Sequence, residues 1–403
     1  MAIDVELARR ETPGCERVAH FDNAGSSLPP SPVLEATIGH LRLEAEVGGY
    51  AAAERAAGAV GRVYDAAAEL LGCASDEIAF VDSASRAWAA GFYALPFRPG
   101  DRILMCRSEY ASNAIAAWQV ARRTGAVVEV VPDDADGQLS VDALRELLDE
   151  RVRLISVTHV PTQGGLVNPA AEIGQVARQA GVPFLLDACQ SAGQLPLDVD
   201  ELGCDLLALT GRKFLRAPRG TGLLYARRET TGGLEPAMLD LHSAEWVAPE
   251  RVEIRTDARR FEFWESNVAA RIGLGVAIDY ALGWGLEAIW ERVRGLADSL
   301  RAALSELPGV TVHDLGRVRS GIVSFTVAGL GAGDVRAALA EAGITVSVSD
   351  AGSARWDMDG RGLAELVRAS VHYYNSEEEV GRLARAVGGL SPGRPGRELR
   401  PGA

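Results

Sequence analysis

The sequence almost lacks lysine: of its 41 basic residues, 40 are arginine and only one, Lys213, is lysine. A GC-rich genome that writes arginine wherever either cation serves would explain the general bias. Under such a bias, the lysine that remains marks a position where arginine does not serve. Arginine stays protonated in proteins, whereas a lysine amine can lose its proton and attack a carbonyl group. The composition therefore makes Lys213 the first candidate for a chemical role.

Other scarcities exclude whole classes of protein. No apolar run approaches the roughly 20 residues of a membrane-spanning helix, and residues 1–20 carry charges of both signs without the apolar core of a signal peptide. The net charge of −14 argues against general nucleic-acid binding. The five cysteines are scattered, without a CxxC pair or histidines at metal-ligand spacing. We expect a cytoplasmic protein that binds small molecules and no metal, membrane or nucleic acid.

The apolar pattern predicts a mainly parallel sheet followed by a smaller unit. In the first two thirds, short apolar runs alternate with helical patterns, which is typical of βαβ units. The expected strands there are residues 102–106, 127–131, 154–158, 183–186, 206–209 and 222–226, and the expected helices include 86–95, 141–148 and 169–180. Beyond about residue 280 we expect a helix at 286–307, a strand at 321–327, a helix at 333–342, a strand at 366–373 and a last helix that begins with a capping box at Ser376 and Glu379.

These patterns predict an α/β protein with two domains. An N-terminal segment, 1–20, precedes a large doubly wound domain, 21–280, and a small α+β domain, 281–390, follows. The tail, 391–403, is rich in glycine, proline and arginine, so we expect it to be disordered.

Two expected strands place an acid and the single lysine at one edge of the sheet. Asp187 follows the strand 183–186, and Lys213 follows the strand 206–209. Ligands of open parallel sheets collect at that edge. Pyridoxal phosphate needs both groups, an amine for its aldehyde and a carboxylate that keeps its pyridine nitrogen protonated. Taken alone, Asp187 could equally be an ordinary helix N-cap.

A third element suits the phosphate of such a cofactor. The segment DSAS at residues 82–85 precedes the expected helix 86–95. Free backbone N–H groups and hydroxyls at a helix N-terminus bind anions, although a serine-rich cap usually only caps its helix.

The motifs DACQ at 187–190 and TGRKFLRAPRGTG at 210–222 resemble the class V aminotransferase and cysteine desulfurase family of fold-type I pyridoxal-phosphate enzymes. The resemblance extends from FDNAGSS at 21–27 to RASVHYYNSEEEV at 368–380, nearly the whole chain. It implies an α/β fold of the fold-type I transferase kind, with a mainly parallel, seven-stranded sheet in the large domain and a smaller α+β C-terminal domain. It also implies a homodimer with shared active sites.

The resemblance further implies roles for residues around the cofactor ring. Lys213 carries pyridoxal phosphate as a Schiff base and then moves protons at the Cα atom of the substrate. Asp187 pairs with the pyridinium nitrogen, and Gln190 contacts the phenolic oxygen. Thr162 stands near that oxygen where the family has asparagine. Tyr110, the second predicted catalytic residue, replaces a ring-stacking histidine; it can stack, but it cannot act as a near-neutral acid or base.

The phosphate and the substrate are assigned to other residues by the same resemblance. The residues that hold the phosphate within one subunit are Ala84, Ser85, Thr210 and Arg212, the last at a position where the family commonly has histidine. Ser266, in WESN, occupies the position from which the family reaches the phosphate of the other subunit. The predicted substrate-binding residues are Asn23, Gly25 and Arg368, with Arg368 clamping the carboxylate through its planar fork.

The family includes transaminases, desulfurases, epimerases and C–S lyases, so the fold does not choose the reaction. Persulfide-forming desulfurases use a nucleophilic cysteine in a loop that matches residues 346–359, and VSVSDAGSARWDMD contains none. Cys189, inside the cofactor motif, is interpreted as packing. The chain is therefore most similar to C–S lyases that act on S-substituted cysteines, such as ergothioneine-type enzymes and those of sulfur-containing antibiotic biosynthesis.

The predicted reaction is β-elimination, which yields a thiol or sulfenate, pyruvate and ammonia. Decarboxylating oxidative deamination, transamination or epimerisation of a similar amino acid stays open, as does a catalytically inactive binding protein, against which the intact Lys213 and Asp187 argue. Four residues could line the pocket for the sulfur substituent or be no more than core or surface, namely Arg259, Arg260, Trp264 and Trp356.

Overall fold

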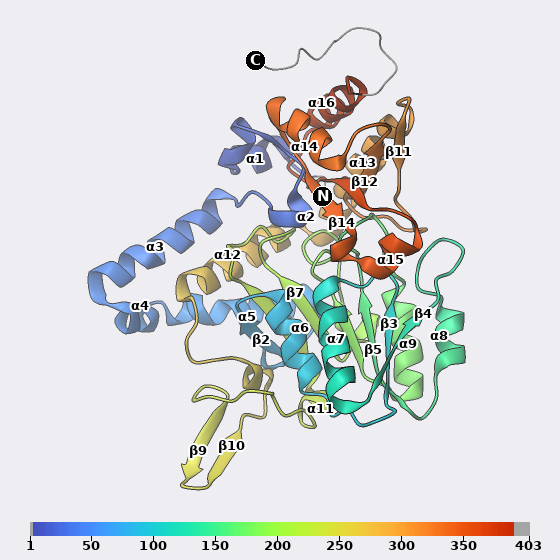
Figure 1. Ribbon diagram of the computed structural model, residues 1–403. Coiled ribbons are helices and arrows are strands. Elements are labelled where there is room, and N and C mark those ends of the chain that lie inside the picture. The colour runs from blue at the N-terminus through green and yellow to red at the C-terminus, as the bar shows by residue number, and fades with distance from the viewer. Residues whose placement is uncertain (1–2, 391–403) are drawn as a thin grey trace, which may run out of the picture.

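The structure is a computed structural model that describes residues 3–390 (Figure 1). The predicted disordered tail, 391–403, lies outside the described residues. The α-helices are α1 (Val5–Arg10), α2 (Asn23–Ser26), α3 (Ser31–Val47), α4 (Gly49–Arg55), α5 (Ala57–Leu71), α6 (Ala84–Tyr93), α7 (Ala111–Thr124), α8 (Val141–Leu147), α9 (Ala170–Ala180), α10 (Val199–Leu202), α11 (Arg228–Thr231), α12 (Val268–Trp284), α13 (Leu286–Ser305), α14 (Ala332–Glu341), α15 (Arg355–Gly360) and α16 (Glu377–Gly388). The strands are β1 (Ala19–His20), β2 (Ile78–Val81), β3 (Arg102–Cys106), β4 (Val127–Val131), β5 (Val152–Thr158), β6 (Phe184–Asp187), β7 (Leu206–Thr210), β8 (Gly222–Ala226), β9 (Ala244–Ala248), β10 (Arg251–Ile254), β11 (Val310–Val312), β12 (Ile322–Val327), β13 (Ile344–Thr345), β14 (Ser347–Asp350) and β15 (Glu365–Ser370).

A seven-stranded sheet forms the centre of the molecule, in the order β2-β8-β7-β6-β5-β3-β4. The strands from β7 to β4 run parallel, whereas β8 is antiparallel to both β7 and β2. The expected mainly parallel α/β sheet is thus confirmed. Every expected strand and helix is present, with ends that differ by three residues or fewer.

The central strands read as continuous apolar runs because both faces of the sheet are covered. In β7, Leu206 and Ala208 belong to the core beneath α6 and α7, whereas Leu207 and Leu209 belong to the core that includes α5, α9 and α12. Figure 1 shows α6 and α7 in front of the sheet. Burial on both faces fixes the strands and leaves their carboxyl ends as the place where polar side chains collect.

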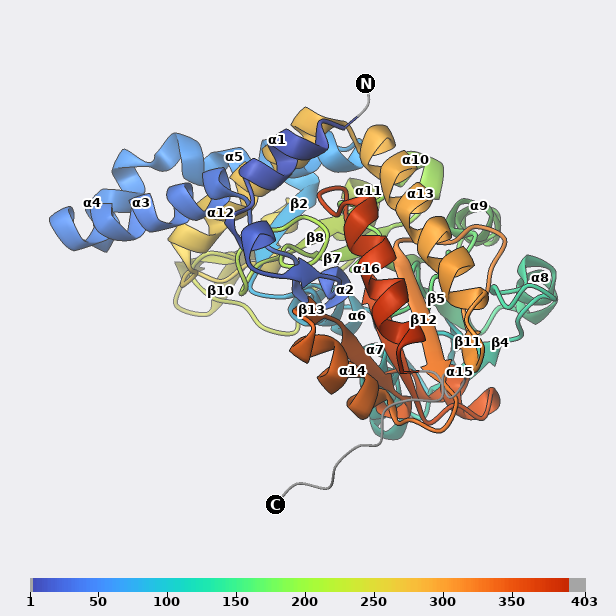
Figure 2. The ribbon, with the colours of Figure 1, turned by 90° about the horizontal axis from the view of Figure 1, so that it is seen from above.

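A four-stranded antiparallel sheet, in the order β11-β12-β15-β14, forms a second layer structure. Helices α13, α14 and α16 pack against it or against one another, and Figure 2 shows α14 and α16 together on the same side. The predicted capping box of α16 is present between Ser376 and Glu379. The expected strand 366–373 ends earlier, at Ser370. Beyond it, the side-chain oxygen of Asn375 accepts a hydrogen bond from the backbone N–H of His372 at 2.8 Å, so this N–H is not available to a neighbouring strand.

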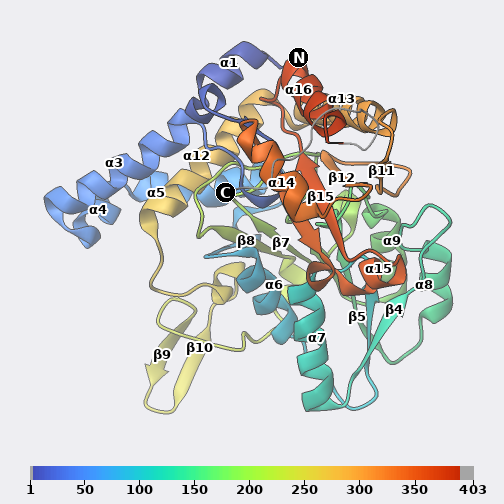
Figure 3. The same ribbon diagram turned by 45° about the horizontal axis from the view of Figure 1, so that its top comes forward.

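The N-terminal segment forms a two-stranded sheet of its own and is linked to the second sheet by a bridge. Strand β1 pairs in parallel with β13, and a bridge links Asp22 to Ser370. Figure 3 shows β15, α14 and α15 above the carboxyl edge of the large sheet. The domain boundaries at residues 20 and 280 stay a proposal.

Two parts of the fold were not expected from the sequence pattern. Helices α3 and α4 project from the body of the molecule, and β9 and β10 form an antiparallel hairpin, at the left and lower left of Figure 1. In the described part of the chain, no single helix has the length and hydropathy to cross a membrane; α12 and α13 meet those criteria only when taken together, and they are bent by 79°.

Candidate active site

The carboxyl ends of the central strands surround a cavity. Asp187 is the last residue of β6 and Thr210 the last of β7, and Lys213 follows in the turn after β7. The predicted cofactor residues that line this cavity are Ala84, Ser85, Tyr110, Thr162, Asp187, Gln190, Thr210, Arg212 and Lys213. It is also lined by Ser83, Asn113, Thr158, Val160 and Cys189. The edge of the sheet therefore brings together nine of the ten residues predicted for the cofactor, all except Ser266.

Lys213 and Asp187 have the properties that a pyridoxal-phosphate site requires. Burial lowers the pKa of the Lys213 amine to about 8, with the neighbouring Arg212 acting in the same direction. Roughly a fifth of the amine is therefore neutral, and nucleophilic, near pH 7.4, far more than for a lysine in water. The carboxylate of Asp187 is 4% exposed and accepts hydrogen bonds from the backbone of Cys189 and from Asn113, both at 2.9 Å.

The turn that presents Lys213 is anchored by a buried arginine. The backbone N–H of Arg216 donates to the carbonyl of Lys213 at 2.9 Å, and Arg216 has a φ of 63°, a left-handed conformation that an L-residue rarely adopts. Its guanidinium donates to the carbonyl of Leu28 at 2.9 Å and to the hydroxyl of Tyr373 at 2.6 Å, and it lies 4.5 Å from the ring centre of Tyr374. These contacts hold the strained turn in place.

The phosphate end of the cavity is the N-terminus of α6. The hydroxyl of Ser83 caps this helix by accepting from the N–H of Arg86 at 3.3 Å. A Cβ atom at Gly222 would lie 2.6 Å from the carbonyl carbon of Ser83 and 2.8 Å from the N of Ala84. Glycine at this position therefore lets β8 approach the helix start closely. The first N–H groups of a helix have no partner within the helix, so the start of α6, which lines the cavity, is suited to bind an anion.

The guanidinium of Arg212 donates a hydrogen bond to the carbonyl of Gly25 in α2. Its predicted contact with the phosphate stays a prediction. Tyr110 precedes α7 and is 37% exposed, so its ring is free to move against a ligand in the cavity.

A buried amide atom without a partner indicates that the cavity accepts a polar ligand. The Oε1 atom of Gln190 has no hydrogen-bond partner, while its Nε2 donates to Ala24 O at 3.1 Å and to Thr162 Oγ1 at 3.4 Å. An unsatisfied buried polar atom costs about 1–3 kcal/mol. The amine, carboxylate, amide and hydroxyl groups match the aldehyde, pyridine nitrogen, phenolic oxygen and phosphate of pyridoxal phosphate, so the residues present fit this cofactor.

The predicted substrate clamp, Arg368, is paired with an acid that the sequence did not single out. Its guanidinium is 7% exposed and donates to Asp22 Oδ1 at 3.0 Å, to Thr162 Oγ1 at 2.6 Å and to Ser347 Oγ at 3.0 Å. A Cβ atom at Gly25 would lie 2.5 and 2.6 Å from the two carboxylate oxygens of Asp22. Gly25 thus makes room for the partner of Arg368.

Asn23 forms hydrogen bonds within the protein, and its predicted contact with the substrate stays a prediction. Its side chain is fully buried, donates to the carbonyl of Ser370 at 2.7 Å and accepts from the hydroxyl of Tyr374. These hydrogen bonds tie α2 to the residues after β15. The polar side-chain atoms of Asn23 are therefore used within the protein.

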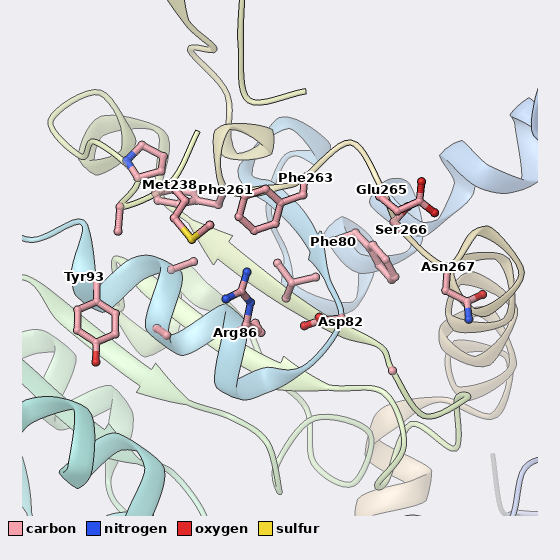
Figure 4. A pocket seen from close by; sticks show the side chains of 16 residues that line it. Phe80, Asp82, Arg86, Tyr93, Met238, Phe261, Phe263, Glu265, Ser266 and Asn267 are labelled. Carbon is pink, nitrogen blue, oxygen red and sulfur yellow. The ribbon is translucent and has the colours of Figure 1, made fainter. Parts of the chain in front are cut away.

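Ser266 lines a second, larger cavity of about 330 Å³, which does not include Lys213 (Figure 4). The labelled side chains around it include Phe80, Phe261 and Met238. Its predicted reach into another subunit stays a prediction.

None of the four residues considered for the substituent pocket lines the cavity around Lys213. Arg260 is buried and donates to the carbonyls of Thr231 and Leu234, and Arg259 lies 3.9 Å over the ring of Tyr64, so both serve packing. Trp264 is 59% exposed, and Trp356 packs in part against the core beneath α6 and α7.

The residues at or beside the site that sequence reasoning missed include Asn113 and Glu109. Asn113 and Glu109 flank Tyr110 in the segment SEYASN, and Asn113 contacts Asp187 directly. Their spacing of four residues around a predicted site residue was the available signal. Cys189 lines the cavity, but burial raises the pKa of its thiol well above the usual value, so it is not a ready nucleophile.

Comparisons relate this chain to known proteins over nearly its whole length. The sequence model of the family described as aminotransferase class-V matches residues 19–383. A probable cysteine desulfurase of Methanothermobacter thermautotrophicus is 32% identical over 389 residues, which cover 95% of this chain and 97% of that protein. The apo structure of a cysteine desulfurase from Thermococcus onnurineus NA1 is 29% identical, with a TM-score of 0.90 and coverage of 98% of this chain and 99% of that one.

A second solved structure is that of the cystine C–S lyase C-DES in complex with its reaction product, cysteine persulfide. It is 26% identical, with a TM-score of 0.85 and coverage of 94% of this chain and 100% of that one. A mutant of C-DES carries glycine covalently linked to its pyridoxal-phosphate cofactor and has the same TM-score and identity.

Proposed function

The chain belongs to the class V aminotransferase family of fold-type I enzymes with a pyridoxal-phosphate cofactor, and on this premise we propose that it is a C–S lyase. Its substrate is an S-substituted L-cysteine, or the corresponding sulfoxide, and the reaction is β-elimination to a thiol or sulfenate, pyruvate and ammonia. We place this reaction in secondary metabolism, in the formation of an antibiotic or a small thiol. The likeness to the cystine C–S lyase supports the proposal, because cystine is itself an S-substituted cysteine.

The observation that carries the proposal is the lack of a thiol poised to accept sulfur. The segment 346–359, which runs through β14 and α15, contains no cysteine. It packs near the cavity, where Ser349 Oγ donates to the carbonyl of Thr162 at 3.4 Å and Gln163 donates to Asp357 at 3.0 Å. The only cysteine among the described residues that line the cavity is Cys189, which burial keeps protonated. Sulfur therefore leaves with a substituent that the substrate already carries.

Three residues of this chain have separate roles in the proposed reaction. Arg368 binds the substrate carboxylate, and Asp187 holds the proton on the pyridine nitrogen. The freed amine of Lys213 takes the proton from Cα, the Cβ–S bond breaks, and the electron pair of that bond leaves with sulfur. Pyridoxal phosphate, when bound, supplies the electron sink that makes the Cα proton acidic. Water then hydrolyses the remaining three-carbon fragment to pyruvate and ammonia.

The test begins with the absorbance spectrum of the purified protein before and after borohydride, in the wild type and in Lys213→Ala. We expect a cofactor band that borohydride fixes to the protein only when Lys213 is present. L-cystine and S-alkyl cysteines, with their sulfoxides, are then assayed for pyruvate. Pyruvate in stoichiometry with the released thiol supports the lyase. A fixed cofactor with no pyruvate from any of these compounds would refute it.

The product distinguishes the alternatives. A keto acid formed only with an amino acceptor indicates transamination, an aldehyde with carbon dioxide indicates decarboxylating deamination, and a racemised substrate indicates epimerisation. Alanine instead of pyruvate, formed from unsubstituted L-cysteine as its sulfur is removed, would match the name carried by the desulfurase relatives.

We further propose a homodimer with shared sites, on the basis of Ser266. In a heterodimer of a Lys213→Ala chain with a Ser266→Ala chain, one site has both residues intact. Mixed dimers should therefore be more active than either parent dimer, whereas activity no higher than the mean of the parents would contradict sharing.

A further inference from the structure

Two buried carboxyl groups beneath the cofactor cavity are joined by one amide. Glu109 lies between β3 and α7 and is 2% exposed, and Asp187, at the end of β6, is 4% exposed. The Nδ2 atom of Asn113 donates to Glu109 Oε1 at 2.8 Å and to Asp187 Oδ2 at 2.9 Å. An amide nitrogen has two hydrogens, so each carboxyl group takes one. The orientation of Asn113 is therefore set jointly by both acids.

Glu109 has no cationic partner in the described part of the chain. Its Oε1 atom accepts from the hydroxyl of Thr158 and from the backbone N–H of Tyr110 at 3.0 Å, and its Oε2 atom faces Cys106 Sγ at 3.7 Å. A buried carboxyl group held only by neutral donors is uncommon, because an unpaired charge is costly to bury. Such a group is retained where its hydrogen bonds, its charge or both are used.

The titratable groups that face Glu109 come from two of the elements packed against it. From β6 comes Asp187, and from β3 comes Cys106, whose thiol pKa is raised well above its usual value by burial. The residues that face it from β5 and α7, Thr158 and Asn113, do not titrate. Burial raises the pKa of Glu109 to about 7, and the charge of Asp187 acts in the same direction, while the hydrogen bonds from Thr158 and Asn113 lower it.

We propose that Glu109 is a positioning residue for the cofactor: through Asn113 it holds the carboxylate of Asp187 toward the pyridine nitrogen, and its own charge is sensed by the bound ring. Glu109 does not itself line the cavity, so it acts only through its neighbours. When Glu109 ionises, the added negative charge favours the protonated pyridine nitrogen. The inference rests on the cofactor and not on the proposed substrate.

The test uses holoenzyme whose cofactor has been fixed to Lys213 with borohydride, so that neither turnover nor the lysine linkage contributes to the signal. The fluorescence and absorbance of the fixed ring are followed against pH. We expect an inflection near pH 7 in the wild type, matching the pKa of Glu109. Glu109→Gln keeps the Oε1 acceptor for Asn113 and Thr158 but cannot titrate, so the inflection should be lost.

Two further variants identify the titrating group. Thr158→Val is close in shape and removes a hydrogen bond that favours the ionised carboxylate, so the inflection should move to higher pH. Asp133→Asn is the matched control, because Asp133 is a second acid with a raised pKa, about 6 through burial, and it pairs with Arg107 away from the cavity. This control should leave the inflection unchanged.

The proposal is overturned if the wild type has no inflection near pH 7, if the inflection persists in Glu109→Gln, or if Asp133→Asn removes it. Should Glu109→Gln fail to fold, an unmoved inflection in Thr158→Val overturns the proposal by itself. If the cofactor assignment itself is wrong, the result is different: borohydride would then fix no ring to the wild-type protein. Failure of the lyase assignment leaves these titrations unaffected.

Discussion

Replacing Asp22 with asparagine should strengthen the binding of a carboxylate ligand to Arg368. In the structure the carboxylate of Asp22 accepts from Arg368 at 3.0 Å and so occupies part of the fork that a substrate carboxylate needs. In Asp22→Asn the charged competitor is gone, and Thr162 and Ser347 still hold the guanidinium. The ligand then becomes the main counter-ion of a buried arginine.

The expected gain follows from the strength of a hydrogen bond between charged groups, which is about 1.5–3 kcal/mol. The Asp22 side chain is 27% exposed, and asparagine still offers an acceptor, so the lower end applies. A gain of about 1.4 kcal/mol corresponds to a roughly tenfold lower Kd.

The assay compares two ligands of the holoenzyme by spectral titration, L-alanine and alaninol, which differ in the carboxylate. The ratio of their Kd values isolates the contribution of Arg368 and does not depend on the natural substrate. We expect the ratio to shift about tenfold toward L-alanine in Asp22→Asn. A ratio that is unchanged, or that shifts toward alaninol, would refute the reasoning and show that Asp22 orients Arg368 for the ligand instead.

Gly25→Ala offers an independent route to the same state. Its Cβ atom would lie 2.5 Å from Asp22 Oδ1, far inside the roughly 3.5 Å of a favourable contact, so the carboxylate must turn toward solvent. The same shift in the Kd ratio should result. The matched control is Gly39→Ala on α3, where an added Cβ meets nothing within 4 Å; it should leave the ratio unchanged and add up to about 1 kcal/mol of stability.

Three further outcomes are expected. Gly222→Ala should weaken pyridoxal-phosphate binding at least about tenfold by pushing Ser83 away from β8, and an unchanged Kd in a fluorescence titration of apoprotein would contradict this. Arg216→Met should lower the free energy of unfolding by about 2–4 kcal/mol, because the carbonyl of Leu28 and a tyrosine hydroxyl lose a charged donor; an unmoved urea midpoint would count against it. The rate at which apoprotein binds pyridoxal phosphate covalently should rise with pH and level off above about 8, since burial lowers the pKa of Lys213 to that value and only the neutral amine attacks; a flat pH profile would exclude this account.

The predicted site residues that the structure brings together were found from features close together in the chain. Asp187 and Lys213 each follow an apolar strand directly, so the rule for parallel sheets places both at one edge. The surroundings of Asn23 could not be predicted, for the opposite reason. Its environment depends on Ser370 and Tyr374, which are more than 340 residues away in the sequence, and no local pattern reports such a contact.

The sequence by itself determined the class of fold and the cofactor, and it singled out Lys213 as the residue predicted to carry that cofactor. Continuous apolar strands, alternating helical patterns and a single lysine after a strand are local features. Such features can be recognised from one sequence, because they involve residues that are close together in the chain. Only the tertiary structure decided what surrounds that lysine. The pairing of Arg368 with Asp22 and the bridge from Glu109 to Asp187 join segments that are distant in sequence, and the pKa values of Lys213 and Glu109 depend on burial, which exists only once the chain has folded.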